Sequence, residues 1–529
     1  MTRVRTVVVG VAASLALLVL VVAVVTVMLW SRWSDGARAR LVATLAEQFD
    51  AEVTLDDLRV QVFPGLRAEG RGLTVRHHGR QDVPPLLSIA HFSAEGSIAQ
   101  LLHKHVSRLD LDGLDIEIPP DHDVQIPPDR DTETPADRTP APTARQVPQG
   151  LVVDQLFSNS ARLAINPREK DKDPKVWNIH TLKMTSVSID QAMPFEAVLT
   201  NAIPPGEIHT DGTFGPWQSD QPGRTTLDGA FTFENAHLAV FKGIGGVLSA
   251  RGHFGGVLER IDIHGQTETP DFEVEPGRHP IALHTQYHAI VDATNGNTYL
   301  EQVDASFLKT ALVAKGSVID EPGKPGRTVA LDVSIERGRI EDVLALAVNT
   351  PKAPMTGALQ LTTRLVLPPG DQDVVKKLRL KGRFSISGSR FTTLDVQKKV
   401  NELSRRGRGM SPEEMKGLVT SRFVGEFTLA GGRLDIPKVT FDVPGSVVEL
   451  GGTYDLLPEQ LNFTGTLFMD AKVSETATGI KRLLLKVVDP LFNRDGGGSA
   501  IPIRISVKRS DPDFGLDRSR VFKNPDKRR

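Results

Sequence analysis

Apolar and polar residues alternate along most of the chain, which is the pattern of β-strands with one side buried and the other facing solvent. Within residues 55–76, Leu58 and Val60 alternate with polar side chains until Phe63-Pro64-Gly65 interrupts the run, and the alternation then resumes. A Pro-Gly break between two such runs is typical of a turn between antiparallel strands. We therefore expect a sheet whose apolar face must be covered by something.

The alternation returns in the second half of the chain. Apolar residues occupy nearly every second position in the runs 329–335, 359–367 and 439–443. Helical spacing is confined to a few short segments: 35–49, 340–347, a helical hairpin over 395–420, and an apolar stripe within 476–491. The pattern predicts a mostly β protein with antiparallel strands and a few short helices.

The N-terminal region has a different composition. Residues 7–30 carry no charge, and as a helix they would rise about 36 Å, enough to cross a hydrocarbon core of about 30 Å. Arg3 and Arg5 precede the run and Trp33 follows it. These features predict an uncleaved transmembrane helix with residues 1–6 in the cytoplasm, and a cleaved signal peptide is the alternative.

The remaining boundaries follow from composition. Residues 119–150 are rich in proline and poor in apolar residues, so we expect a linker or exposed loop. The other predicted segments are an N-terminal β region over 31–118, a central β-repeat region over 151–370, a C-terminal β region over 371–517 and a charged tail over 518–529.

Charge and candidate chemistry argue against several functions. With 63 basic and 65 acidic residues the formal net charge is −2, so nucleic acid is not an expected partner. The chain has no cysteine, which excludes a thiol nucleophile. His284 and His288 would lie about 13 Å apart on one strand, too far to share a metal ion, and the glycine-rich stretch 242–256 lacks the ending of a phosphate-binding loop. We expect no catalytic residue, metal or cofactor, and no enzymatic activity.

Three parts of the sequence resemble the AsmA family of membrane-anchored periplasmic proteins of Gram-negative bacteria. The first is the order anchor, short helix, AEVTLDDLRVQVFPGLRAEGRGLTV, PLLSIAHFSAEGSIAQLL and SRLDLDGLDIEI. The second is KGRFSISGSRFTTLDVQKKVNEL, and the third is VVELGGTYDLLPEQLNFTGTL with the later GGGSAIPIRISVKRSDPDFGLD. The resemblance covers roughly residues 30–120 and 375–517, and the middle matches only in its β character.

The resemblance implies an elongated, curved sheet with a hydrophobic groove, anchored in the inner membrane with the bulk of the chain in the periplasm. It is similar to bridge-like lipid transfer proteins, so the implied function is to bind or transfer phospholipid for outer-membrane maintenance. Envelope proteins are further possible partners. Two alternatives remain open: a scaffold or assembly factor for outer-membrane proteins, which would bind client strands at a sheet edge, and a membrane-tethered β-sandwich that acts as a sensor or an enzyme.

Candidate site residues follow from the alternation and from the helical stripe. The groove candidates are Val60, Val62, Leu359, Leu361, Val439, Phe441, Leu461 and Phe463. The candidates for a membrane-surface helix or a lid at the groove end are Lys481, Arg482, Leu484, Lys486 and Val488. Alternation alone does not say which face of each strand is the inner one.

Overall fold

The computed structural model describes most of the chain between residues 37 and 516. The described residues are 37–49, 51–61, 65–77, 84–97, 100, 105–118, 152–165, 175–188, 190–218, 221–275, 277–320, 326–370, 372–410, 417–456, 460–472, 498–508 and 511–516. The predicted transmembrane helix over 7–30, the proline-rich segment over 119–150, the predicted helix over 476–491 and the charged tail over 518–529 all lie outside this set.

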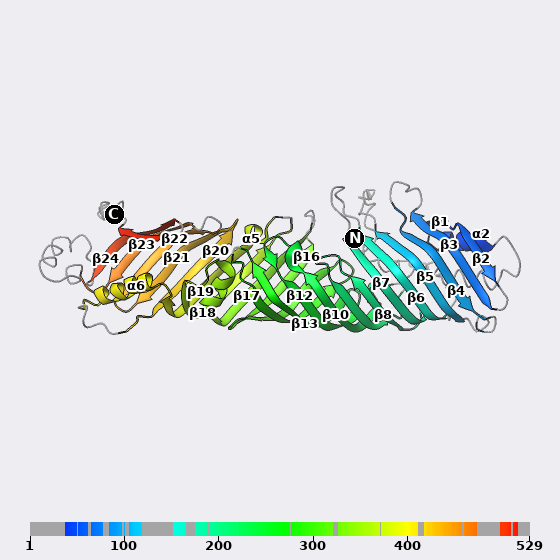
Figure 1. The fold of residues 1–529 in the computed structure, drawn as a ribbon, viewed down its shortest axis with the longest axis horizontal. Coiled ribbons are helices and arrows are strands. Elements are labelled where there is room, and N and C mark those ends of the chain that lie inside the picture. Colours follow the sequence, from blue (N-terminus) through cyan, green and yellow to red (C-terminus); the bar gives the residue numbers. More distant parts are fainter. Residues whose placement is uncertain are drawn as a thin grey trace, which may run out of the picture. The chain divides into compact units, whose positions relative to one another are not determined.

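Strands dominate the described chain (Figure 1). Those up to the middle of the chain are β1 (Ala51–Thr54), β2 (Asp57–Gln61), β3 (Leu66–His77), β4 (Leu87–Gly96), β5 (His105–Ile118), β6 (Val152–Ile165), β7 (Lys175–Val187), β8 (Met193–Thr200), β9 (Glu207–Phe214), β10 (Thr226–His237), β11 (Ile244–Gly245), β12 (Val247–Val257) and β13 (Arg260–Val274). Those that follow are β14 (Ile281–Asp292), β15 (Asn297–Phe307), β16 (Thr310–Asp320), β17 (Arg327–Arg339), β18 (Met355–Leu367), β19 (Arg379–Phe391), β20 (Ser421–Ala430), β21 (Arg433–Val443), β22 (Ser446–Asp455), β23 (Gln460–Met469), β24 (Ser499–Lys508) and β25 (Asp511–Leu516).

The helices are few and short. They are α2 (Ala37–Phe49), α4 (Ile340–Ala347), α5 (Val374–Lys377) and α6 (Leu394–Gly407), with 3-10 turns η1 (Pro222–Arg224) and η2 (Leu238–Val240). The helix predicted over 340–347 is confirmed residue for residue. Among the described residues, none of the helices is both long and apolar enough to span a membrane.

The strands belong to one large, mixed, open β-sheet, which confirms a mostly β fold with few helices. Neighbours along the chain pair in antiparallel fashion in nearly every case, as between β18 and β19 or between β22 and β23. The exception is β5 with β6, which run parallel from His105↔Val152 to Ile118↔Ile165. The prediction of antiparallel strands is therefore wrong at this pair, and the sheet is mixed. A parallel pair needs a connection of a dozen residues or more, and residues 119–151 provide that length.

The chain divides into two compact units. Unit 1 contains residues 1–236, 249–265 and 290–296, and unit 2 contains 237–248, 266–289 and 297–529. The strands on either side of the proline-rich segment both belong to unit 1, where they pair with each other.

Unit 1 has a dense core under its helix. Leu41 and Leu45 of α2 are buried with inward side chains of β1 to β6, among them Phe92, Leu111 and Leu156. In α2 the two leucines are four residues apart, so they lie on the same side of the helix and face the sheet together. A helix therefore covers the apolar side of the first strands.

Candidate functional site

In unit 2 the strand register aligns apolar side chains into continuous rows. The first row, which runs from β18 to β24, contains Leu359, Ile386, Phe423, Phe441, Val448, Leu467 and Ile501. The second row, which runs from β17 to β23, contains Leu331, Leu365, Leu380, Leu429, Leu434, Tyr454 and Leu461. Residues directly opposite one another on paired strands share a side of the sheet. Because residues two apart along a strand also share a side, both rows lie on one surface, which we call the apolar face of unit 2.

The described groove candidates of unit 2 all lie on this apolar face. Leu359 and Phe441 belong to the first row and Leu461 to the second, while Leu361, Val439 and Phe463 lie between the rows. Alternation alone did not say on which side of the sheet these six residues lie. The register shows that they share one side. Whether lipid binds there stays a prediction.

The candidates in unit 1 have different surroundings. Val60 on β2 is half-buried and packs against the closed core beneath α2, so its apolar contacts are already with protein. Val62 lies outside the described residues, as do the lid candidates Lys481, Arg482, Leu484, Lys486 and Val488.

Two helices cover one end of the apolar face. Ile340 and Val343 of α4 pack against Leu359 and Ile386. Val400 of α6 packs in a cluster with Phe441 and Val448, and Figure 1 shows α6 lying across β21 to β23. The sequence predicted both helices but gave no sign of where they would lie on the sheet.

Burial along the strands reflects this coverage. Near the helices, Leu359 is 2% exposed, Ile386 4% and Val448 4%. The members of the second row lie farther along the same strands, and all but Leu429 are half-buried. Phe423, Leu467 and Ile501 of the first row are half-buried as well. The apolar face is therefore partly exposed in both rows, and it is best covered at Leu359, Ile386 and Val448.

Phenylalanine rings lie across glycines of the neighbouring strand. A Cβ atom at Gly425 would lie 3.1 Å from the ring of Phe384, and one at Gly452 would lie 2.8 Å from the ring of Phe463. Unit 1 has the same arrangement, where a Cβ at Gly70 would lie 2.2 Å from the ring of Phe92. Glycine allows each ring to lie close to the backbone, so the aromatic side chains are partly covered by the sheet itself.

The opposite side of unit 2 is polar and charged. Lys438 pairs with Glu449 at 3.3 Å, and Arg364 pairs with Asp332 at 3.0 Å. These pairs are solvent-exposed, and exposed pairs of this kind stabilise a fold by about 0–1 kcal/mol each. They identify the water-facing side and make the contrast with the apolar face clear.

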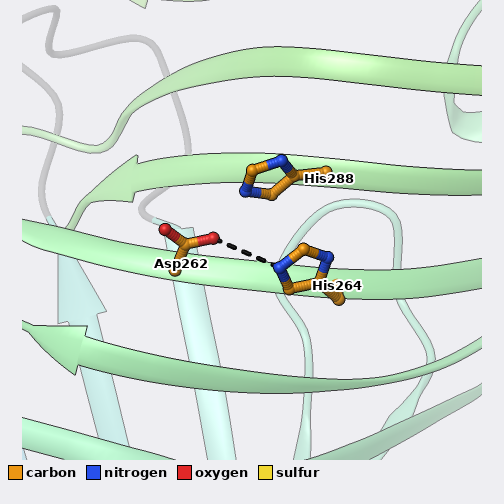
Figure 2. Close-up of side chains that lie close together, drawn as sticks. All are labelled: Asp262, His264 and His288. Atoms are coloured by element: carbon orange, nitrogen blue, oxygen red, sulfur yellow. Dashed lines mark ion pairs between the residues drawn. The ribbon is translucent and has the colours of Figure 1, made fainter.

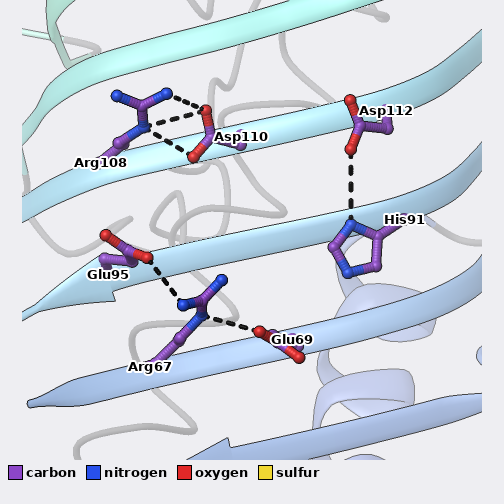
Figure 3. A network of polar contacts seen from close by, with 7 residues as sticks. All are labelled: Arg67, Glu69, His91, Glu95, Arg108, Asp110 and Asp112. Carbon is purple, nitrogen blue, oxygen red and sulfur yellow. Dashed lines mark hydrogen bonds and ion pairs between the residues drawn. The ribbon is translucent and has the colours of Figure 1, made fainter.

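The outer surface of β3 to β5 in unit 1 is also charged (Figure 3). Arg67 contacts Glu69 at 2.8 Å and Glu95 at 3.3 Å, and Arg108 contacts Asp110 at 2.7 Å. Since basic and acidic groups neutralise one another here, the network marks a solvated sheet surface rather than a catalytic cluster.

A charged side-chain pair also lies on the unit 1 part of β13. Asp262 and His264, two residues apart on β13, form an ion pair at 3.4 Å (Figure 2). The side chains of Asp262 and His264 are 43% and 68% exposed, so the pair belongs to the solvated surface of the sheet.

Unit 2 also contains an open hollow of about 680 Å3 along β13 to β17. Its lining includes Glu268, Asp304 and Glu336 together with His284 and Arg337, and it shares no residue with the two apolar rows. Apolar groups also line the hollow, and Leu312 among them packs against the cluster of Ile335, Leu359 and Ile386.

In comparisons with known proteins, no family model, curated protein or solved structure matches the chain.

Proposed function

We propose that this protein binds acyl chains of phospholipid on the apolar face of unit 2, and holds or transfers the lipid for outer-membrane maintenance without chemical conversion. The observation that supports this proposal is the pair of register-aligned apolar rows whose members away from α4 and α6 are half-buried. Sheets usually bury an apolar face beneath a second protein layer. A lipid chain would supply such a layer where no described helix covers the face.

The available free energy is sufficient for such binding. Each buried methylene group contributes about 0.8 kcal/mol, so a sixteen-carbon chain could gain at most about 12 kcal/mol. On a face that is only partly open the gain is smaller, because one side of the chain remains in contact with water. Partial burial therefore favours a lipid that is held but can still leave.

The cellular setting is part of the same proposal. We propose that the protein is of the AsmA type, with residues 7–30 anchoring it in the inner membrane and the sheet curling into an elongated groove in the periplasm. The support is the uncharged run at 7–30 and the resemblance over roughly 30–120 and 375–517.

Site-specific photocrosslinking of the full chain in living cells tests the proposal. The photoreactive residue p-benzoylphenylalanine replaces Leu434, which lies on the apolar face of β21 (the inward side), or the adjacent Asp435, which lies on the opposite, outward side. A second matched pair is Leu461 and Asn462 on β23. The cells are grown with radioactive phosphate, irradiated, and the purified protein is examined for covalently attached phospholipid.

We expect label at Leu434 and Leu461, and little label at Asp435 and Asn462. The comparison is demanding, because the two outward positions are the more exposed ones. Equal labelling of inward and outward positions, or no labelling, would refute lipid binding on this face. Crosslinks to protein instead of phospholipid at Leu434 and Leu461 would also refute lipid binding on this face.

A further inference from the structure

The outward surface of α6 combines basic side chains with exposed leucines. Between residues 394 and 408 the sequence has five basic and two acidic residues. Lys398, Lys399 and Arg406 are exposed, and Leu394 at the start of the helix is 76% exposed. Leu418, in the segment that leads into β20, is 62% exposed. We call Leu394, Lys398, Lys399, Arg406 and Leu418 the α6 surface.

The sheet-facing side of α6 is fixed by polar anchors. The Gln397 side chain accepts a hydrogen bond from the Phe391 backbone N–H at 2.8 Å and donates one to the Val419 carbonyl at 3.0 Å. Ser404 donates to the Pro444 carbonyl at 2.7 Å. With Val400 buried in the same interface, α6 cannot turn its basic side toward the sheet.

The same anchors place Leu418 beside the helix. The Val419 carbonyl and N–H both bond to α6, the carbonyl through Gln397 and the N–H to the Asn401 side chain at 3.2 Å. Leu418 precedes this bonded residue, so it lies close to the part of α6 that carries Gln397 and Asn401. A second exposed leucine is therefore near the first half of the helix.

We propose that the α6 surface docks on a bilayer that contains anionic lipids. Arginine and lysine side chains would contact the headgroups while Leu394 and Leu418 enter the upper acyl region, as in interfacial amphipathic helices. This docking goes beyond lipid binding on the apolar face, because it concerns a separate surface on the outside of the molecule.

Charge is what identifies the bilayer as the occupant. Glu402 accepts hydrogen bonds from Arg405 and Arg406 at 2.6 Å, so the one acidic residue in the middle of the helix is already neutralised within α6. These hydrogen bonds, that of Arg405 first, lower the pKa of Glu402 to about 2, so the carboxylate keeps this arrangement at physiological pH. Asp395 in the first turn is a second acidic residue. Five basic and two acidic residues leave three excess positive charges over residues 394–408, which complement anionic headgroups.

The test measures flotation of the full chain, purified in peptidiscs, with lipid vesicles. One set of vesicles contains phosphatidylglycerol and phosphatidylcholine in equal amounts, and the other contains phosphatidylcholine alone. The test variant combines Lys398→Gln, Lys399→Gln and Arg406→Gln. The matched control combines Arg379→Gln, Lys381→Gln and Arg383→Gln, which removes three exposed charges from β19 in the same unit.

We expect the unmodified chain and the β19 control to bind the anionic vesicles, and binding to neutral vesicles to be weak. Each basic side chain near an anionic surface accounts for about a fivefold change in affinity, so the α6 variant should bind roughly a hundredfold more weakly. The double variant Leu394→Asp and Leu418→Asp should also lose binding, because it puts carboxylates where the leucines would enter the acyl region. Both leucines are exposed, so the fold should survive the change.

Equal losses in the α6 variant and the β19 control would overturn the proposal, as would binding that is unchanged in both. Equal binding to neutral and anionic vesicles would also overturn it. Photocrosslinking at Leu434 is measured in the same variants, because docking and occupation of the apolar face are separate properties. Retained lipid label with no vesicle docking refutes only the docking surface, whereas docking without label refutes only the proposed function.

Discussion

Shortening the connection between β5 and β6 should disrupt unit 1 once the connection can no longer reach from the end of β5 to the start of β6. The parallel register of the two strands determines this minimum length. Val152 lies opposite His105, while the connection starts after Ile118 at the far end of β5. Thirteen residues of strand separate these two ends, which is about 43 Å at about 3.3 Å per residue. The connection must cover this distance before β6 can run parallel to β5.

The sequence between the two strands, residues 119–151, is 33 residues long. Removal of residues 122–148 leaves six, and their seven Cα steps reach at most about 25 Å. Removal of residues 126–138 leaves twenty, which reach about 75 Å. We therefore expect the six-residue variant to lose the β5–β6 pairing and the twenty-residue variant to keep it. The shorter closed loop of the latter should even stabilise the fold slightly, by about 0.4 kcal/mol.

Hydrogen exchange of the full chain in peptidiscs measures this directly. The backbone amides of β6 should exchange rapidly in the six-residue variant, because strand pairing and the buried contacts of Val153 and Leu156 are lost together. In the twenty-residue variant they should stay as protected as in the unmodified chain. Native protection of β6 in the six-residue variant would show that the parallel register is wrong.

Three further predictions concern the helices of unit 2, all read from urea unfolding of the purified chain. Gly407→Ala should destabilise α6 by about 2–4 kcal/mol, because the new Cβ would lie 2.0 Å from Ser446 Oγ and the overpacking exceeds the gain in helix propensity; an unchanged midpoint would contradict the close approach. Asp342→Ala should cost about 2–3 kcal/mol, since this buried carboxylate accepts hydrogen bonds at the start of β16; a loss no larger than at an exposed site would count against it. Glu402→Gln should cost less than about 1 kcal/mol at pH 7, because the Glu402 side chain is 42% exposed and solvent screens its pairs with Arg405 and Arg406. The pKa of Glu402 is lowered to about 2 in the folded chain, so this difference should shrink as the pH falls through the ordinary glutamate range toward that value; a difference that grows instead would show the opposite sign.

Much of the fold could be read from periodicity. The alternation of Val439, Phe441 and Val443 placed these residues on one side of a strand, and β21 has that arrangement. Helical spacing likewise identified α4 and the first half of the hairpin predicted over 395–420, which is α6. The second half is not a helix where it is described, since residues 417–420 lead into β20 in an irregular conformation.

What periodicity could not provide was direction and contact. An alternating strand has the same pattern whether its neighbour is parallel or antiparallel. The only indication in the sequence that β5 and β6 run parallel is the long segment between them. The position of α6 depends on Gln397, Ser404 and Gly407, which are buried although two of them are polar. Such residues resemble surface positions in a sequence, and only the hydrogen bonds to Val419 and Pro444 reveal their role.

The N-terminal edge of the sheet has a consequence for how copies of this protein behave at high concentration. β1 and β2 both pair with β3, and they meet opposite Gly72, whose positive φ of 62° breaks the line of the edge. The edge therefore consists of strands of four and five residues, and Arg59 and Gln61 are exposed on the second. An edge this short and interrupted offers few consecutive backbone groups for pairing with a second molecule, so the unit resists fibre growth from that side.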